Sequence, residues 1–593
     1  MKPSRKSKPG SCHPEGAGEL RDGLQPQQYR RWSPEAKARM LAEALAPDAH
    51  VPAPAGAPGA GSWQDFAWRR NAVADSEADT EPSQTDGNPP FRPFEAEPAL
   101  PIAVELFRAL NAAGLKYGIV QDLASVQDAL AGRDDLDVLL DKHDYPVFCS
   151  IVSRMQGRRG VSLSCYDNVC AGREDWFIPD FSRGRYLHLD THIGVRVGRE
   201  FRKRYLAFDY ATIARWESIC VEDVSVPVVS PEDEIRIAIA RFAFRARAFP
   251  WSRWITLSDR WKDQLARLPS LPGEQSLHVV EYTFGGGRTA ICRFRKSGDD
   301  LVADFGDLAG LRRSIREMSG FTGHYAVADA AVHLVRKTSY LALRLLQRLM
   351  PGRLPPKRRP VAGGLVVAVI GPDGVGKSTQ VDRLTRTFRW KFGCAQAYVG
   401  TGDGRGWWLR KRLQSLILPH RRSLKSLVQQ DGNDSIRRSW AKGGVVATGL
   451  ALWAVLIAFE RYAVVKRAHR WATRGMIVVS DRWPQTLRRG YLDGPTIPEH
   501  LFSIPGLSAL ARLEQKLYQK MEECRPHLIL HLVSDFAVSE QRKPGEIRKE
   551  AFDARLSLMA ELRSRDKDIR TVDASASLET VNRELFRHIW LSL

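Results

Sequence analysis

The amino-acid sequence predicts an α/β protein of 593 residues, and three features carry this prediction. The run Leu365–Ile370 is rich in β-branched residues, and a glycine-rich loop and a helical pattern follow it. A second apolar run, Met476–Val479, leads into Asp481. Upstream, strand-like and helix-like segments alternate from about residue 91. Such alternation is typical of a sheet with helices packed on its faces.

Residues 1–90 are expected to form a largely disordered segment. The stretches 46–62 and 75–90 are rich in proline, glycine, alanine and acidic residues, so they bury too little apolar surface to offset the entropy lost on ordering. One helix is predicted within this segment at 33–46, where Ser33 caps it and Pro34 occupies its first position.

Residues 91–350 are predicted to form an α+β domain. Helical spacing covers 102–114 and 145–155, and strand patterns cover 116–121, 136–141 and 186–197. A capped helix begins at Ser230, and a hairpin-like stretch follows at 278–305. The proline-rich basic segment 351–360 is expected to be a linker. A second globular domain is then predicted for 361–593.

The loop after Leu365–Ile370 has the spacing of a phosphate-binding loop: Gly371, four residues, Gly376, Lys377 and Ser378. In such a loop the backbone N–H groups and the N-terminus of the following helix face an anion. Lys377 is expected to reach the β- and γ-phosphates, and Ser378 to help hold Mg²⁺.

Asp481 is predicted to be the acidic partner of this loop, because it ends the second apolar strand. In open α/β sheets, ligands bind at the carboxyl ends of the strands. Asp481 is therefore expected to organise Mg²⁺ together with Ser378, and Arg482 to lie beside the transferred phosphate.

The motifs "GPDGVGKST" and "SDRW" together resemble the thymidylate kinase family of P-loop kinases. The resemblance spans nearly all of 361–593 and implies a five-stranded parallel sheet flanked by helices, with ATP and Mg²⁺ as cofactors. It implies catalytic roles for Asp373, Lys377, Arg482 and Arg542, and Arg548 is a weaker lid candidate. It also implies nucleotide contacts for Gly371, Gly374, Gly376, Lys377, Ser378, Thr379 and Asp573. Of these, Asp573 is expected near adenine, together with Ala574. The segment 484–495, "PQTLRRGYLDGP", departs from the family's base-recognition stretch, so the acceptor stays open.

A second candidate site lies in the first half of the chain. Asp135 and Asp137 are two residues apart on a predicted strand, so their side chains share one face, and Asp190 lies on a later strand. This pattern resembles the minimal nucleotidyltransferase-like family, in which three carboxylates hold two Mg²⁺ ions. The Gly-Ser helix start of that family is absent ahead of Asp135. A domain that kept the fold and lost catalysis is the alternative interpretation.

The net charge of +21 predicts anionic partners: nucleotides, phosphorylated or sugar acceptors, or acidic lipid head groups. The basic, aromatic segment 404–428 either contacts an anionic membrane surface or covers an acidic acceptor, unless it is simply a helix with a solvated basic side. The uncharged run 443–459 is expected to be a core or membrane-touching helix rather than a transmembrane span. No nucleic-acid recognition signature accompanies the charge, so nucleic acid is not favoured.

The scattered cysteines, and a basic N-terminal sequence that lacks the apolar core of a signal peptide, predict a cytoplasmic protein, with peripheral contact at the inner membrane face as an extension. Three functions are open. The first is ATP- and Mg²⁺-dependent phosphoryl transfer to a nucleoside monophosphate or related small acceptor. As an alternative acceptor for this transfer, the combination of the two resembled families implies a sugar or glycan in surface polysaccharide biosynthesis. The second is nucleotidyl transfer by the first half. The third is a non-catalytic, ATP-switched protein at the membrane surface.

Overall fold

The computed structural model describes these residues: 98–121, 123–162, 172–199, 202–213, 215–245, 254–257, 277–284, 288–297, 300–305, 308–319, 325–349, 356–400, 444–545, 548–566 and 568–593. The chain divides into two compact units, 1–94 and 95–593, and every described residue belongs to the second. The predictions of disorder in 1–90 and of a basic surface segment at 404–428 lie outside the described residues.

A five-stranded sheet forms the centre of the C-terminal part. Its strands are β15 (Leu365–Ile370), β16 (Cys394–Tyr398), β17 (Ile477–Asp481), β18 (Leu528–Val533) and β19 (Ile569–Asp573), in the spatial order β16-β17-β15-β18-β19. Every neighbouring pair is parallel. The prediction of a five-stranded parallel sheet for this part is therefore confirmed. Every residue of β15 is buried, as expected of a parallel sheet covered on both faces.

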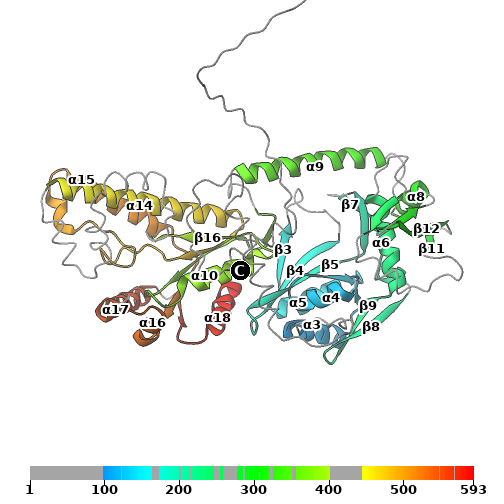
Figure 1. Ribbon diagram of the computed structural model, residues 1–593, viewed down its shortest axis with the longest axis horizontal. Helices are drawn as coiled ribbons and strands as arrows, with labels where there is room; N and C mark the ends of the chain where they lie inside the picture. The colour runs from blue at the N-terminus through cyan, green and yellow to red at the C-terminus, as the bar shows by residue number, and fades with distance from the viewer. Residues whose placement is uncertain are drawn as a thin grey trace, which may run out of the picture. The chain divides into compact units, whose positions relative to one another are not determined.

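Helices cover both faces of this sheet, and the alternation of side chains along β15 decides which helix meets which face. Val367 packs in one hydrophobic cluster with residues of α10 (Lys377–Arg389) and α18 (Leu578–Leu591). Val366 points the other way and packs with residues of α14 (Gly444–Thr473). Figure 1 shows α14 and α15 (Leu507–Glu523) on the side of β16 opposite to α10 and α18. Two further helices, α16 (Phe536–Arg542) and α17 (Lys549–Arg565), connect β18 to β19.

The apolar run at 443–459 lies within α14, which begins at Gly444 and continues to Thr473. By length and composition, 448–473 is the one helix in the described part of the chain that could cross a membrane. Small side chains on this helix, Ala468 and Ala472, are buried against the sheet. Its middle carries Arg461, which is 6% exposed and makes polar contacts inside the protein. The structure thus gives α14 a packing role in the α/β core.

The first half contains an eight-stranded mixed sheet in the order β14-β3-β4-β5-β2-β1-β9-β8. The strands are β1 (Tyr117–Ile119), β2 (Asp135–Leu140), β3 (Arg158–Ser162), β4 (Arg173–Asp180), β5 (Arg185–His192), β8 (Trp216–Val221), β9 (Val224–Val229) and β14 (Arg358–Pro360). Three helices pack on one face: α3 (Pro101–Ala112), α4 (Leu123–Leu130) and α5 (Tyr145–Arg154). Leu139 lies on the other face, in a cluster with residues of α6 (Pro231–Arg245).

Smaller elements extend this half. Two strands, β6 (Val195–Arg199) and β7 (Arg202–Phe208), form a small sheet, and a four-stranded sheet consists of β10 (Trp254–Leu257), β11 (Leu277–Phe284), β12 (Arg288–Ser297) and β13 (Asp300–Phe305). The helices α8 (Leu308–Met318) and α9 (Tyr325–Leu349) and the 3-10 helix η1 (Tyr210–Thr212) also belong to this half. A second 3-10 helix, η2 (Glu499–Ser503), lies in the C-terminal part. The hairpin expected at 278–305 corresponds to the pairing of β11 with β12.

The segment predicted as a linker contributes to the sheet of the first half. Within 351–360, the strand β14 pairs antiparallel with β3, so that Arg358 lies opposite Ser162. The two halves also share a core, because Tyr186 of β5 packs in one cluster with Phe388 of α10 and Trp590 of α18. The Trp590 indole donates a hydrogen bond to the Gln156 carbonyl at 2.9 Å. These contacts explain why 95–593 forms one compact unit.

Candidate functional site

The loop between β15 and α10 requires glycine at two positions for different reasons. A Cβ atom on Gly371 would lie 2.6 Å from the Leu532 carbonyl oxygen of the neighbouring strand. Gly376 has a φ of +93° directly before the first helical residue, a conformation that L-residues with side chains rarely adopt. The loop therefore turns tightly off the strand and brings the N-terminus of α10 to the carboxyl edge of the sheet, where backbone N–H groups can face an anion.

Asp481 lies at the same edge because β17 runs parallel to β15, with Asp481 opposite Val369. Its side chain is 2% exposed, and the Ser378 hydroxyl donates a hydrogen bond to its Oδ2 at 2.5 Å. Among the described residues, its other oxygen, Oδ1, has no hydrogen-bond partner. A buried carboxylate oxygen beside a serine hydroxyl fits a divalent cation such as Mg²⁺, which prefers oxygen ligands.

Lys377 is the first residue of α10 and is 6% exposed. Its ammonium donates a hydrogen bond to the Pro372 carbonyl at 2.6 Å and lies 3.6 Å from an oxygen of Asp373. Burial lowers the pKa of Lys377 to about 8, and the positive charges of Arg482 and Arg555 act in the same direction, against the attraction of Asp373. The charged form of Lys377 is thus destabilised at the loop, and a bound anion would stabilise it.

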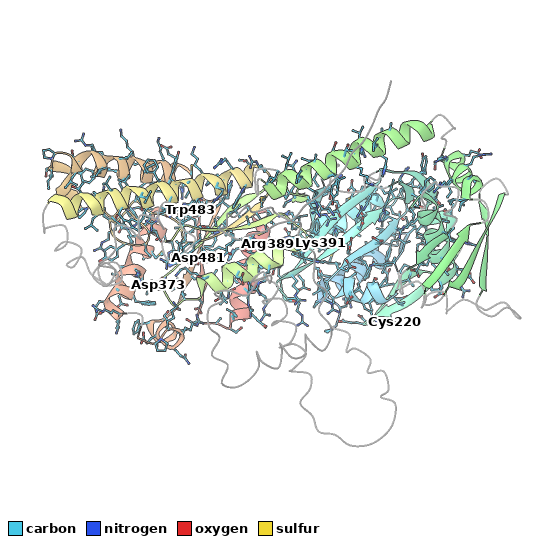
Figure 2. The ribbon with its side chains drawn as sticks, turned by 45° about the horizontal axis from the view of Figure 1, so that its top comes forward. Cys220, Asp373, Arg389, Lys391, Asp481 and Trp483 are labelled. Carbon is cyan, nitrogen blue, oxygen red and sulfur yellow. The ribbon has the colours of Figure 1, made fainter. Side chains whose placement is uncertain are left out.

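Asp373 joins three cations of the site. Arg482 donates to its Oδ1 at 2.9 Å, Arg555 donates to its Oδ2 at 2.9 Å, and Lys377 lies beside it. Burial opposes ionisation of this carboxyl group, but these three positive charges and that of Lys543 together outweigh burial and lower its pKa. Figure 2 labels Asp373 and Asp481 in this part of the molecule. The result is a carboxylate that stays ionised and holds two arginines in fixed positions.

Arg482 is oriented by its own backbone and by Asp493. The residue has a φ of +72°, and its N–H donates to the Val369 carbonyl at 3.0 Å. Its guanidinium also lies 3.6 Å from Asp493. Arg461 of α14 in turn donates to Asp493 at 2.6 Å and to the Tyr518 hydroxyl at 2.5 Å. The core helix α14 therefore supports the position of Arg482.

Sequence reasoning missed Arg555, Asp493 and Arg461. Arg555 lies on α17, beyond the two arginines proposed for the lid, and its pattern resembles an ordinary solvent-facing helical position. Asp493 lies in the segment 484–495, whose departure from the family pattern was its only signal. For Arg461, its place close behind the uncharged run 443–459 of the same helix was a usable signal, because a buried charge needs partners.

Of the remaining predicted residues, Arg542 and Gly374 lie at the loop, whereas Thr379, Asp573 and Arg548 are exposed. Arg542 contacts the loop, since it donates to the Val375 carbonyl at 3.3 Å and to the Ala574 carbonyl at 2.9 Å. Thr379 and Asp573 are exposed, and Asp573 accepts a hydrogen bond from the N–H of Ser575 within its own turn. Arg548 precedes α17 and is exposed. Gly374, with a φ of +83°, completes the loop.

The structure also brings together the predicted acids of the first half. Asp137 on β2 lies opposite Asp190 on β5, and together with His192 they offer ligand atoms within 4.8 Å of one another. However, the Arg173 Nε donates to both oxygens of Asp190 at 2.6 and 2.8 Å, and Arg241 lies 3.9 Å from Asp137. These carboxylates are already paired with cations, so the geometry does not support the nucleotidyltransferase interpretation.

Asp135 serves a different contact. Its Oδ1 lies 3.3 Å from the ammonium of Lys391, a residue that follows α10. The expected three-carboxylate cluster of the first half is therefore divided. Asp190 faces Arg173 of β4 and Asp137 faces Arg241 of α6, whereas Asp135 faces Lys391 after α10.

Comparisons with known proteins agree with a nucleotide-handling site. No protein-family model matches the chain. Over 223 residues it is 30% identical to the protein described as "Uncharacterized ATP-binding protein YghR" of Escherichia coli strain K12. This match covers 36% of this chain and 83% of YghR. The YghR protein of E. coli O6:H1 strain CFT073 matches equally, and "Uncharacterized ATP-binding protein YghS" of strain K12 is 27% identical over 181 residues, 30% of this chain and 73% of YghS.

Among solved structures, the thymidylate kinase of Candida albicans matches 38% of this chain and 91% of its own chain. The sequence identity is 15% and the TM-score is 0.22. The P-loop α/β fold of this chain is assigned from its own parallel sheet and from the geometry of the loop between β15 and α10.

Proposed function

Since this chain belongs to the family of the ATP-binding protein YghR, we propose that its C-terminal part transfers a phosphoryl group from ATP, with Mg²⁺, to a small phosphate-bearing acceptor. The observation that carries the proposal is the arrangement at the carboxyl edge of the parallel sheet. There, a glycine loop, a buried lysine, and a serine bonded to a buried aspartate converge. This is the set of groups that phosphoryl transfer requires for positioning and charge neutralisation.

Nucleotide binding is assigned to the loop with the start of α10, to Asp481 of β17 and to Arg542 of α16. The N–H groups at the start of α10 would face the phosphates, and Lys377 would turn from the Pro372 carbonyl toward them. Ser378 and the unpartnered Oδ1 of Asp481 would hold the metal ion. When bound, Mg²⁺ supplies positive charge against the β- and γ-phosphate oxygens. Arg542, bonded to the loop backbone and to Ala574, would close the nucleotide side of the site.

The acceptor side is assigned to the cluster of Asp373, Arg482 and Arg555. Two guanidinium groups at 2.9 Å from one carboxylate leave an excess of positive charge beside the loop. The lowered pKa of Asp373 makes it a weak base, which disfavours abstraction of a hydroxyl proton. An acceptor that attacks through a phosphate oxygen needs no such proton transfer. A nucleoside monophosphate or a sugar phosphate therefore fits this cluster better than an uncharged sugar.

In the proposed step, an acceptor phosphate oxygen forms a bond to the γ-phosphorus of ATP while the bond from that phosphorus to the β–γ bridging oxygen breaks. ADP leaves and the acceptor gains one phosphoryl group, so atoms and charge balance without a base. Arg482 and Arg555 would stabilise the charge on the transferred group, and Lys377 would stabilise the charge that develops on the leaving ADP.

An acceptor screen with γ-labelled ATP tests this proposal on the full chain. The panel contains nucleoside monophosphates, sugar phosphates, nucleosides and unphosphorylated sugars. Labelled product is expected only from phosphorylated acceptors, and Lys377→Ala is expected to abolish it, because the loop loses its cation. Lys520→Ala, which removes an exposed lysine on α15, is the matched control and should leave the rate unchanged. Transfer that continues in Lys377→Ala would contradict the proposal.

A further inference from the structure

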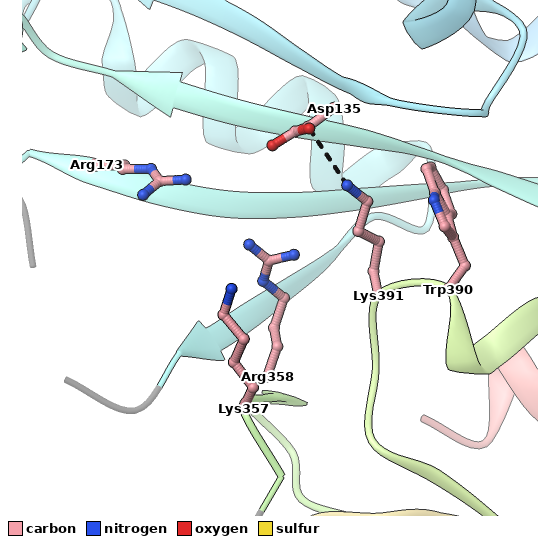
Figure 3. Close-up of a pocket in the computed structure, with 6 residues that line it drawn as sticks. All are labelled: Asp135, Arg173, Lys357, Arg358, Trp390 and Lys391. Carbon is pink, nitrogen blue, oxygen red and sulfur yellow. Dashed lines mark hydrogen bonds and ion pairs between the residues drawn. The ribbon is translucent and has the colours of Figure 1, made fainter. Parts of the chain in front are cut away.

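A second basic site lies apart from the phosphate loop. A cavity of about 330 Å³ is lined by Asp135, Arg173, Lys357, Arg358, Trp390 and Lys391. Figure 3 shows the cationic ends of Arg173, Lys357, Arg358 and Lys391 gathered around one open region, with Asp135 and the Trp390 indole at its edge. The lining thus holds four cationic side chains, one carboxylate and one aromatic ring.

The cations of this cavity are held by neighbouring residues. Arg358 is 8% exposed, and its Nη2 lies 3.1 Å from an oxygen of Asp175. Arg173 is held by both oxygens of Asp190. Such pairing fixes the guanidinium groups before a ligand arrives, which reduces the entropy cost of binding.

Lys391 is placed by three contacts. Its ammonium lies 3.3 Å from Asp135, 3.9 Å from Asp134 and 4.9 Å from the centre of the Trp390 ring, and its side chain is 14% exposed. The indole of Trp390 is itself packed against Tyr186, with ring centres 5.2 Å apart. Both side chains therefore have fixed positions at the wall of the cavity.

The charge of the lining identifies the ligand class. Four cationic side chains and one carboxylate give the lining itself a net charge of +3, and the carboxylates of Asp134, Asp175 and Asp190, which pair with these cations from outside the lining, bring the sum to zero. Positive groups that converge in a partly enclosed space repel one another, and an anion relieves this repulsion. Guanidinium groups match the oxygens of a phosphate through paired hydrogen bonds. The carboxylate of Asp135 accepts hydrogen bonds, so it suits the hydroxyl or amino groups of the same ligand.

We propose that this cavity binds a small phosphorylated molecule that carries a ring, either a sugar phosphate or a nucleotide. Its phosphate contacts Lys357 and the exposed edges of Arg173 and Arg358. Its ring lies against Trp390, and its hydroxyl or amino groups face Asp135. The volume of the cavity is at the lower end of that of small-molecule sites and suits a ligand of this size.

This site is separate from the phosphate loop. Trp390 and Lys391 directly follow the last residue of α10, whereas Lys377 is the first residue of the same helix. The helix has 13 residues, so its ends are about 20 Å apart at a rise of 1.5 Å per residue. Figure 2 accordingly shows Lys391 well away from Asp373 of the loop. The inference therefore does not depend on the proposed kinase activity.

Both halves of the chain supply the cavity. Asp135 and Arg173 come from β2 and β4, while Arg358 belongs to β14 and Lys391 follows α10. A ligand bound here would contact the segment after α10 and the strands of the first half together. It is therefore expected to raise the thermal midpoint of the full chain, because binding to the folded state alone stabilises it.

Isothermal titration of the full chain tests the site with four probes: inorganic phosphate, pyrophosphate, glucose 1-phosphate and AMP. The background variant Lys377→Ala weakens binding at the phosphate loop, so that the signal from the cavity is isolated. At least one ring-bearing probe is expected to bind about tenfold more tightly than inorganic phosphate, through the contact with Trp390. Lys357→Ala is expected to weaken this binding by roughly tenfold, through loss of one charge-assisted contact.

Lys357 is exposed, so its truncation is not expected to unfold the chain. The matched control is Lys116→Ala, an exposed lysine next to β1, at the end of β2 opposite to Asp135, since Tyr117 pairs with Leu140. This control should bind the probes as the background variant does. Two results would overturn the proposal. The first is the absence of any heat of binding from all four probes at millimolar concentration. The second is an unchanged affinity for the tightest probe in the combined variant Lys357→Ala, Lys391→Met, provided that this variant keeps the thermal midpoint of the background variant.

Discussion

Binding of ATP is expected to add a proton to Lys377. Burial, together with the charges of Arg482 and Arg555, lowers the pKa of this side chain to about 8 in the free protein. A group with this pKa is about three quarters neutral at pH 8.5 and about one tenth neutral at pH 7. A triphosphate beside the ammonium favours the charged form. The protein should therefore take up roughly 0.7 of a proton per ATP at pH 8.5 and roughly 0.1 at pH 7.

Calorimetric titration with ATP and Mg²⁺ in two buffers of different ionisation enthalpy measures this uptake. At pH 8.5 the phosphates of ATP are fully ionised, since their last pKa is near 6, so they do not contribute. The observed enthalpy is expected to differ between the buffers at pH 8.5 and to agree closely at pH 7. Lys377→Met should remove the difference, while Lys520→Ala should retain it. Identical enthalpies in both buffers at pH 8.5 for the unaltered chain would contradict a lowered pKa of Lys377 in the free protein.

Three further predictions concern residues that support the site and the fold. Arg555→Met should lower kcat by roughly tenfold to a hundredfold with an unchanged thermal midpoint, as steady-state kinetics and calorimetry would show, because one cation beside Asp373 is lost; an unchanged kcat would remove Arg555 from the acceptor side. Arg461→Met leaves Asp493 buried without its main partner, and chemical unfolding should detect a loss of about 3–5 kcal/mol; a loss below 1 kcal/mol would contradict the buried pairing. Trp590→Ala should cost about 3–5 kcal/mol of unfolding free energy, because the indole is fully buried where the two halves share a core; a near-neutral result in the same assay would contradict that packing.

The features that the sequence predicted best depend on local patterns. The strand Leu365–Ile370 and the loop after it could be predicted because β-branched residues and glycine spacing act within about a dozen positions. Asp481 could be placed because parallel strands end at the same edge of a sheet. The contact between Ser378 and Asp481 then follows from these two elements.

Contacts between distant segments could not be predicted in this way. The strand β14 lies in a proline-rich segment that reads as a linker, and it pairs with a strand almost two hundred positions upstream. Arg555 reaches Asp373 across 182 positions of sequence, and nothing in its neighbourhood distinguishes it from a solvent-facing arginine. The pairing of Asp190 with Arg173 likewise depends on strand register, which sequence alone leaves open.

The metal site formed by Ser378 and Asp481 is tested by the affinity of the full chain for ATP, measured by calorimetry with Mg²⁺ and with EDTA, for the unaltered protein and for Asp481→Asn. Mg²⁺ is expected to tighten ATP binding in the unaltered chain. Asp481→Asn keeps the shape of the side chain but removes its charge, so this variant is expected to lose the effect while remaining folded. Equal ATP affinity with Mg²⁺ and with EDTA in the unaltered chain, or a full Mg²⁺ effect in Asp481→Asn, would contradict the assignment of Ser378 and Asp481 to the metal ion.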